Sequence, residues 1–115
     1  MVSLSTHVLD AAKGLPAAGM TVRLERRDAD SGDAGGSGTG GGWTTLAAAR
    51  TDGDGRIKEW GTELSAGTYR LVFDTSGLSD FYPEVAVAFT ITDPGRHLHV
   101  PLLISPFAYS TYRGS

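Results

Sequence analysis

The sequence predicts an all-β fold, a two-sheet antiparallel β-sandwich. Short segments alternate apolar and polar residues with a period of two, turn-forming residues recur about every eight to twelve positions, and almost no segment has the helical period. This combination is typical of sandwich domains of about a hundred residues. Because the chain has 115 residues, we expect residues 1–115 to form a single domain.

The first strands are expected at the N-terminal end. Residues 2–9 alternate like a half-buried strand, which places His7 on the polar face. Residues 10–18 hold glycine, proline and small residues, which indicates a turn. Residues 20–25 alternate in the same way, so a second strand follows, and we expect a hairpin-like connection between the two.

Residues 28–42 consist almost entirely of Gly, Asp, Ser, Ala and Thr. Such a segment buries too little apolar surface to offset the entropy lost on ordering, so we expect a flexible glycine-rich loop insertion. Its glycines lack the Gly-Lys-Ser/Thr ending of a phosphate-binding loop, which favours a linker over a ligand loop.

The rest of the chain predicts five more strands joined by turns. The Asp- and Gly-rich residues 51–56 indicate a tight turn, and residues 75–83 leave room for one short helical turn before a proline. The strands are expected at residues 43–50, 68–74, 85–92, 98–104 and 109–113.

Composition limits the partners and the compartment. Hydrophobic residues make up 40% of the chain, charged residues 20%, and the net charge is −3, so no basic surface is expected to hold nucleic acid. The chain has no cysteine, which fits a reducing, cytoplasmic setting. The first residues lack the pattern of a secretion signal, and no segment approaches the roughly 20 apolar residues that span a bilayer, so we expect no membrane partner.

Strand alternation places the three histidines on outward-facing positions. In residues 97–103 the apolar Leu98, Val100 and Leu102 share one face, while His97, His99 and Pro101 share the other. A proline donates no ladder hydrogen bond, so we expect an edge strand or a bulge at Pro101. Together with His7, these imidazoles are expected to point away from the core.

The C-terminal tail adds the phenol of Tyr112 to these outward-facing side chains. Alternation places Tyr112 opposite Phe107 and Tyr109, which are expected to face the core. In a monomer the outward groups meet water, whereas stacked outer faces would form a cleft lined by His7, His99 and Tyr112. Three readings stay open: acid–base chemistry, a zinc site held by three imidazoles, and solvated surface side chains. With neither cysteine nor a neighbouring carboxylate to support a metal, acid–base use is favoured over zinc.

Six motifs span nearly the whole chain: Leu4-Ser5-Thr6-His7-Val8-Leu9-Asp10, Gly14-Leu15-Pro16-Ala17, Thr51-Asp52-Gly53-Asp54-Gly55-Arg56-Ile57, Phe81-Tyr82-Pro83-Glu84, His97-Leu98-His99-Val100-Pro101-Leu102-Leu103 and Tyr112-Arg113-Gly114-Ser115. With these motifs the chain resembles the transthyretin-like proteins, specifically the 5-hydroxyisourate hydrolases of purine and urate degradation. The Tyr-Arg-Gly-Ser ending separates these hydrolases from the hormone-carrying transthyretins.

The resemblance implies a homotetramer with active sites at the dimer–dimer interface and no metal or organic cofactor. It implies hydrolysis of 5-hydroxyisourate to 2-oxo-4-hydroxy-4-carboxy-5-ureidoimidazoline. Carried over by motif, the catalytic residues are His7, His99 and Arg56, and the substrate-binding residues are His7, Arg56, Tyr112 and Ser115. The resemblance assigns His97 no direct part in the chemistry.

The roles follow from side-chain chemistry. His7 and His99 are expected to share proton transfer, and Arg56 to hold the substrate's oxygens with its planar fork. Tyr112 and Ser115 are expected to fix the ring by hydrogen bonds. One alternative is a transthyretin-like carrier of small aromatic ligands, which binds without hydrolysis, and another is a structural docking domain.

Overall fold

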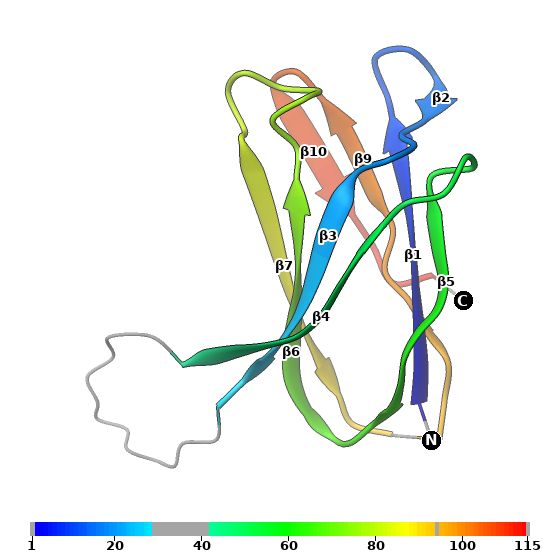
Figure 1. The fold of residues 1–115 in the computed structure, drawn as a ribbon, viewed down its shortest axis with the longest axis vertical. Helices are drawn as coiled ribbons and strands as arrows, with labels where there is room; N and C mark the ends of the chain where they lie inside the picture. The colour runs from blue at the N-terminus through cyan, green and yellow to red at the C-terminus, as the bar shows by residue number, and fades with distance from the viewer. Residues whose placement is uncertain (1, 29–41, 94, 115) are drawn as a thin grey trace.

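The computed structural model describes residues 2–28, 42–93 and 95–114, and this part of the chain is built from strands and turns without a helix. Two sheets face each other (Figure 1), which confirms the predicted all-β sandwich. The strands are β1 (Val2–Asp10), β2 (Leu15–Pro16), β3 (Thr21–Arg27), β4 (Trp43–Arg50), β5 (Arg56–Leu64), β6 (Gly67–Asp74), β7 (Glu84–Ile91), β8 (Leu98–His99), β9 (Leu102–Ser105) and β10 (Ala108–Thr111).

Strand β1 is the centre of the first sheet. The sheet has the order β10-β9-β1-β2, and β5 and β8 also pair with β1. The pairs with β2 and β5 are antiparallel, whereas those with β8 and β9 are parallel. The second sheet has the order β4-β3-β6-β7 and is antiparallel throughout. The predicted hairpin between residues 2–9 and 20–25 is therefore wrong, because β1 pairs with the short β2 and β3 crosses to the second sheet (Figure 1).

Alternation along β1 sets the core and the outer face. Leu4, Thr6 and Val8 are fully buried, and the Thr6 hydroxyl donates to the Val100 carbonyl at 2.6 Å. Burying a leucine or phenylalanine side chain contributes roughly 1.5–3 kcal/mol, so the two inner faces supply most of the stability. The largest fully buried side chains are Tyr69, Phe73, Leu4, Leu24, Leu71, Ile91, Leu102, Ile104, Val8, Val22 and Val85.

A charged cluster ties β3 to β6 in the second sheet. The buried Glu25 carboxylate accepts hydrogen bonds from Arg70 Nε at 2.6 Å and Arg23 Nε at 3.0 Å. Burial raises the pKa of Glu25, but the bonds from Arg70 and Arg23 outweigh it and leave the pKa below its ordinary value. The pairing thus stabilises the charged carboxylate on the outer face of the second sheet, between two partly exposed arginines.

Three sequence predictions for strands need correction. Strand β5 was not predicted, because register shifts against β1 break its period of two. The predicted strand 98–104 is split into β8 and β9, which leaves Val100 and Pro101 between them, as the proline indicated. The last strand ends at Thr111 rather than at residue 113.

The helical turn expected in residues 75–83 is limited to a single turn. The Leu78 and Ser79 N–H groups donate to the Thr75 carbonyl at 2.9 and 3.0 Å, and no helix continues from there. Of the expected glycine-rich loop, residues 29–41 lie outside the described residues, as does Ser115.

The aromatic side chains of the last strand are not in the core, contrary to prediction. Phe107 is 78% exposed and Tyr109 44% exposed. The Phe107 ring lies 6.2 Å from the Phe81 ring, and the Tyr109 ring lies 5.1 Å from the Tyr82 ring, centroid to centroid. We call these four residues the rim aromatics, and they form a largely exposed apolar cluster.

Candidate active site

His7 and Arg56 are neighbours across the first sheet. They are directly opposite each other in the antiparallel pairing of β1 with β5. On β1 the half-buried Ser3, Ser5 and His7 alternate with the core residues, so their side chains share the outer face. Arg56 is exposed beside them. The predicted outward position of His7 is thus confirmed.

The turn before β5 fixes the backbone of Arg56. The Asp52 carboxylate accepts the N–H groups of Asp54 at 2.8 Å and Arg56 at 3.0 Å, and the Asp52 N–H donates to the Arg56 carbonyl at 2.9 Å. The Arg56 and Asp54 N–H groups hold the pKa of Asp52 below its ordinary value. Gly55 has φ +75°, and a Cβ there would lie 2.5 Å from the Val8 carbonyl oxygen, so this turn needs glycine.

His99 is held between β1 and the C-terminal tail. It is opposite Ser5 in the parallel pairing of β8 with β1, and its Nδ1 lies 2.7 Å from the Ser5 hydroxyl. On the other side, the Gly114 N–H donates to the His99 carbonyl at 2.8 Å. A Cβ on Gly114 would lie 2.6 Å from Cδ2 of the imidazole, so the tail packs directly against the ring.

The surroundings of His99 favour its neutral form. Partial burial lowers its pKa, and the positive charges of Arg56, His7 and His97 lower it further, while the backbone of Ser5 acts the other way. The net pKa lies below the ordinary value of 6.5. His99 therefore stays uncharged at neutral pH, as a proton acceptor requires.

An open depression of about 510 Å³ joins these groups on the outer face. It contains Arg56 and His99, whereas His7 is beside Arg56 but does not line it. Tyr112 is 59% exposed and does not line it either. The lining residues are Ser5, Thr6, Arg56, Ile57, Lys58, His97 and His99.

Sequence reasoning missed three contributors to this site. Ser5 shares the outer face of β1 with His7, and the alternation of residues 2–9 was the signal for it. Lys58 stands two positions after Arg56 on β5 and was missed because that strand was not predicted. Gly114 was known only as part of a motif, and its contact with His99 emerges only when the tail folds back.

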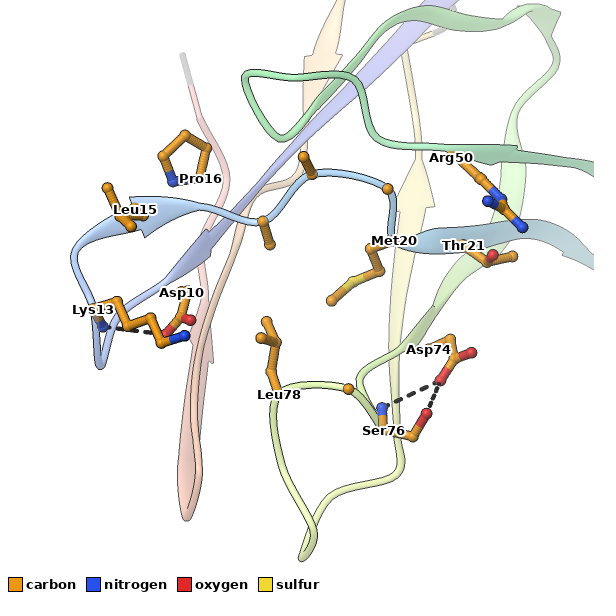
Figure 2. A pocket seen from close by; sticks show the side chains of 14 residues that line it. Asp10, Lys13, Leu15, Pro16, Met20, Thr21, Arg50, Asp74, Ser76 and Leu78 are labelled. Carbon is orange, nitrogen blue, oxygen red and sulfur yellow. Dashed lines mark hydrogen bonds between the residues drawn. The ribbon is translucent and has the colours of Figure 1, made fainter.

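A second and larger hollow, of about 590 Å³, contains none of the predicted site residues. It lies where β2 and the β2–β3 connection approach residues 76–78, with Met20 and Leu78 pointing into it (Figure 2). Its carboxylates already have partners: Asp10 accepts the Lys13 N–H at 3.2 Å, and Asp74 accepts the Ser76 hydroxyl at 2.7 Å. The polar groups that converge for chemistry are those of the outer-face depression.

The zinc alternative gains no support from the arrangement of side chains. Within residues 2–28, 42–93 and 95–114, no three His, Cys, Asp or Glu side chains are grouped to hold a metal ion. Both ring nitrogens of His97 instead bond serine hydroxyls, Nδ1 to Ser3 and Nε2 to Ser5. The described part of the chain also contains no helix that is long and apolar enough to cross a membrane.

This arrangement suits hydrolysis of a polar, oxygen-rich substrate. A neutral imidazole can take a proton from water, and an adjacent guanidinium can stabilise negative charge on an attacked carbonyl. His99 and Arg56 line one depression, and His7 supplies a second imidazole close by.

Comparison with known proteins places the chain among relatives of the same fold. The model of the HIUase/Transthyretin family matches residues 4–114. The 5-hydroxyisourate hydrolase of Mus musculus is 44% identical over 120 residues, which cover 97% of this chain and 94% of the mouse protein. The uric acid degradation bifunctional protein TTL of Arabidopsis thaliana is 43% identical over 97% of this chain, which spans only 37% of that protein.

Solved structures include both a hydrolase and a carrier. Klebsiella pneumoniae 5-hydroxyisourate hydrolase has a TM-score of 0.77 and 36% identity, with all of both chains covered. Sea bream transthyretin in complex with thyroxine has a TM-score of 0.80 and 33% identity, covering 97% of this chain and 94% of that one. Because one fold serves both, the side chains of the site must decide between them.

Proposed function

Because this chain belongs to the HIUase/Transthyretin family, we propose that it is a 5-hydroxyisourate hydrolase, which opens the ring of its substrate to 2-oxo-4-hydroxy-4-carboxy-5-ureidoimidazoline. The observation that carries this proposal is the neutral His99 imidazole beside the Arg56 guanidinium in one polar depression. Full-length similarity to proteins named 5-hydroxyisourate hydrolase supports the same substrate.

His99 is the general base. Its Nδ1 is engaged by Ser5, and Nε2 has no hydrogen-bond partner in the part of the chain that the structure describes. Nε2 is thus the nitrogen that takes a proton from the attacking water. Positioned proton transfer of this kind contributes typically about 10²–10⁴ in rate.

Arg56 and His7 act on the substrate's oxygen and nitrogen atoms. The planar Arg56 fork binds carbonyl or anionic oxygens and stabilises the charge that develops on the attacked carbonyl. His7 protonates the leaving nitrogen. Two close imidazoles disfavour double protonation, which keeps one of them basic. Tyr112 and Ser115 supply hydrogen bonds that orient the ring, and no metal or organic cofactor takes part.

The working enzyme is a homotetramer of the cytoplasm. The depression is open to water on one side, and stacked outer faces would close it and strengthen its electrostatics. The rim aromatics form an exposed apolar cluster of the kind that marks contacts between subunits. The lack of cysteine is consistent with a reducing compartment.

The alternative of a small-molecule carrier is weaker at this site. A carrier of aromatic ligands needs a mostly apolar pocket with few polar groups. Here the depression contains Arg56, Lys58 and two histidines. These groups suit a small polar substrate and a proton transfer.

Turnover of freshly generated 5-hydroxyisourate, followed by the decay of its ultraviolet absorbance, tests the proposal. The wild-type protein should accelerate the decay, and His7→Ala, Arg56→Ala and His99→Ala should each lower kcat/KM by about 10²-fold or more. Ser105→Ala, which removes a hydroxyl on β9 outside the depression, is the matched control. Saturable binding without hydrolysis would favour the carrier, and near-wild-type rates in all three variants would reject the assigned roles.

Sedimentation of the same samples tests the assembly. A tetramer in the wild type and in the three alanine variants is expected, because their side chains line the cleft rather than form the contacts. A fully active monomer would show that stacking is not needed for the chemistry.

A further inference from the structure

Two serines and two histidines form a continuous row of hydrogen bonds on the outer face. Ser3 Oγ lies 2.5 Å from His97 Nδ1, Ser5 Oγ lies 3.0 Å from His97 Nε2, and Ser5 Oγ lies 2.7 Å from His99 Nδ1. The row runs from Ser3 through the exposed His97 and through Ser5 to the half-buried His99. Ser5 is its central member, because it bonds both imidazoles.

We propose that His97 is a positioning residue for His99, which sets its tautomer and exchanges its proton with solvent through the Ser5 hydroxyl. The inference rests on the proposed hydrolase function, in which His99 Nε2 accepts the proton from water. In this role His97 acts through His99 and does not need to contact the substrate.

The number of hydrogens on Ser5 determines how the row sets the tautomer of His99. A serine hydroxyl carries one hydrogen, so Ser5 can donate to only one of the two imidazoles. For His99 Nε2 to be a free base, its Nδ1 must carry the proton and donate to Ser5. Ser5 then donates to His97 Nε2, and His97 Nδ1–H donates to Ser3. Each of the three hydrogen bonds then has one donor and one acceptor.

The same row can carry the charge that catalysis creates. After Nε2 accepts a proton, the Nδ1–H bond of His99 breaks and that proton binds the Ser5 oxygen. The Ser5 O–H bond breaks in turn, and its proton binds His97 Nε2, which makes His97 the imidazolium. His97 then releases its Nδ1 proton to solvent past Ser3. The reverse sequence restores the starting tautomer: a proton from solvent enters at His97 Nδ1, the row returns a proton to His99 Nδ1, and His99 Nε2 releases its proton to solvent after His7 has protonated the leaving nitrogen.

The surroundings of the two histidines favour movement of the positive charge from His99 to His97. His99 is half-buried and faces the charge of Arg56 on β5 and the imidazole of His7 on β1, while the tail contributes the uncharged Gly114. His97 is exposed to water, where a cation is well solvated. A positive charge is therefore more stable at the outer end of the row than at the inner end.

Three substitutions separate a relay from a structural crosslink between β1 and β8. His97→Gln can still bond Ser5 but takes up no proton, and Ser5→Ala cuts the row. Ser5→Thr keeps the hydroxyl and should rescue much of the activity. Arg96→Gln, which changes an exposed charge next to His97, is the matched control.

For a relay, His97→Gln and Ser5→Ala should lower kcat about tenfold or more, with KM within about twofold, because the base rather than the substrate contact is affected. Added imidazole buffer should accelerate the His97→Gln enzyme but not the wild type, since buffer replaces the missing proton acceptor. Wild-type kcat in His97→Gln, or a loss that buffer does not relieve, would overturn the proposal.

The ring nitrogen chemical shifts of His99, measured by NMR, give a readout that is independent of turnover. The wild type should show the Nδ1–H tautomer at neutral pH, and Ser5→Ala should shift the population toward Nε2–H. An unchanged tautomer in Ser5→Ala would refute the positioning role. If the wild type shows no turnover, the hydrolase function fails, and this spectrum still decides whether the row sets the tautomer.

Discussion

Gly114→Ala is the substitution for which the structure predicts the sharpest separation of activity from stability. The added Cβ would lie 2.6 Å from Cδ2 of His99 and 3.0 and 3.1 Å from its Cβ and Cγ. Ordinary contact begins at 3.4 Å, so the tail and the ring must separate by about 0.8 Å. A misplacement of about 1 Å near the chemistry can cost about 10² in rate, and we expect a loss of that order in kcat/KM.

The expected cost in stability is small. The tail beyond Thr111 is not part of a strand, and its bond to the rest of the protein here is from the Gly114 N–H to the His99 carbonyl. Loss of one such bond is worth about 1 kcal/mol, and local fraying at a chain end leaves the core intact.

The assay is the decay of 5-hydroxyisourate absorbance, with thermal unfolding measured on the same protein. Gly77→Ala is the matched control, because a Cβ there meets no atom within 4 Å and the residue is outside the depression. Wild-type kcat/KM in Gly114→Ala, or an equal loss in Gly77→Ala, would refute the argument that tail packing holds His99 in place.

Two further substitutions test the turn before β5 and the charged cluster of the second sheet. Asp52→Ala removes the acceptor of the Arg56 N–H and should lower kcat/KM by about tenfold through a misplaced Arg56, whereas Asp54→Ala, whose carboxylate accepts no bond from a described residue, should change kcat/KM little. Equal kinetics for the two variants would remove the turn from the mechanism. Glu25→Gln should lower the free energy of unfolding in urea by about 2 kcal/mol, because it weakens the charged bonds from Arg70 and Arg23, and should leave kcat unchanged. A lowered kcat at unchanged stability would contradict this.

The outer face of β1 could be predicted from sequence because strand alternation is a local property. It places His7 opposite the buried Leu4 and Val8, as the structure shows. The partner of His7 could not be predicted in this way. Strand β5 carries Arg56, and its register shifts against β1 hide the period of two.

The tail shows where local patterns fail. Alternation divides the residues of β10 between two faces, but it does not say which face meets a second sheet. All four residues of β10 are exposed, as is Phe107 before it. The contact of Gly114 with His99 depends on the tail turning back beside β8. Such contacts come from tertiary structure, and only the motif pointed to them.

The pH dependence of kcat/KM tests the central claim most directly, that His99 is a neutral base in the depression. Because burial and then Arg56 lower the pKa of His99, the base form should persist below pH 6.5, and the acidic limb of the profile should inflect below that value. Because the pKa of His99 is lower in the folded protein than in the unfolded chain, the unfolded chain takes up the proton first as the pH falls. The contribution of His99 to the free energy of unfolding therefore decreases as the pH drops from 6.5 toward the folded-state pKa. His99→Ala should remove this limb; an inflection at or above pH 6.5, or an unchanged limb in His99→Ala, would show that His99 is not the base.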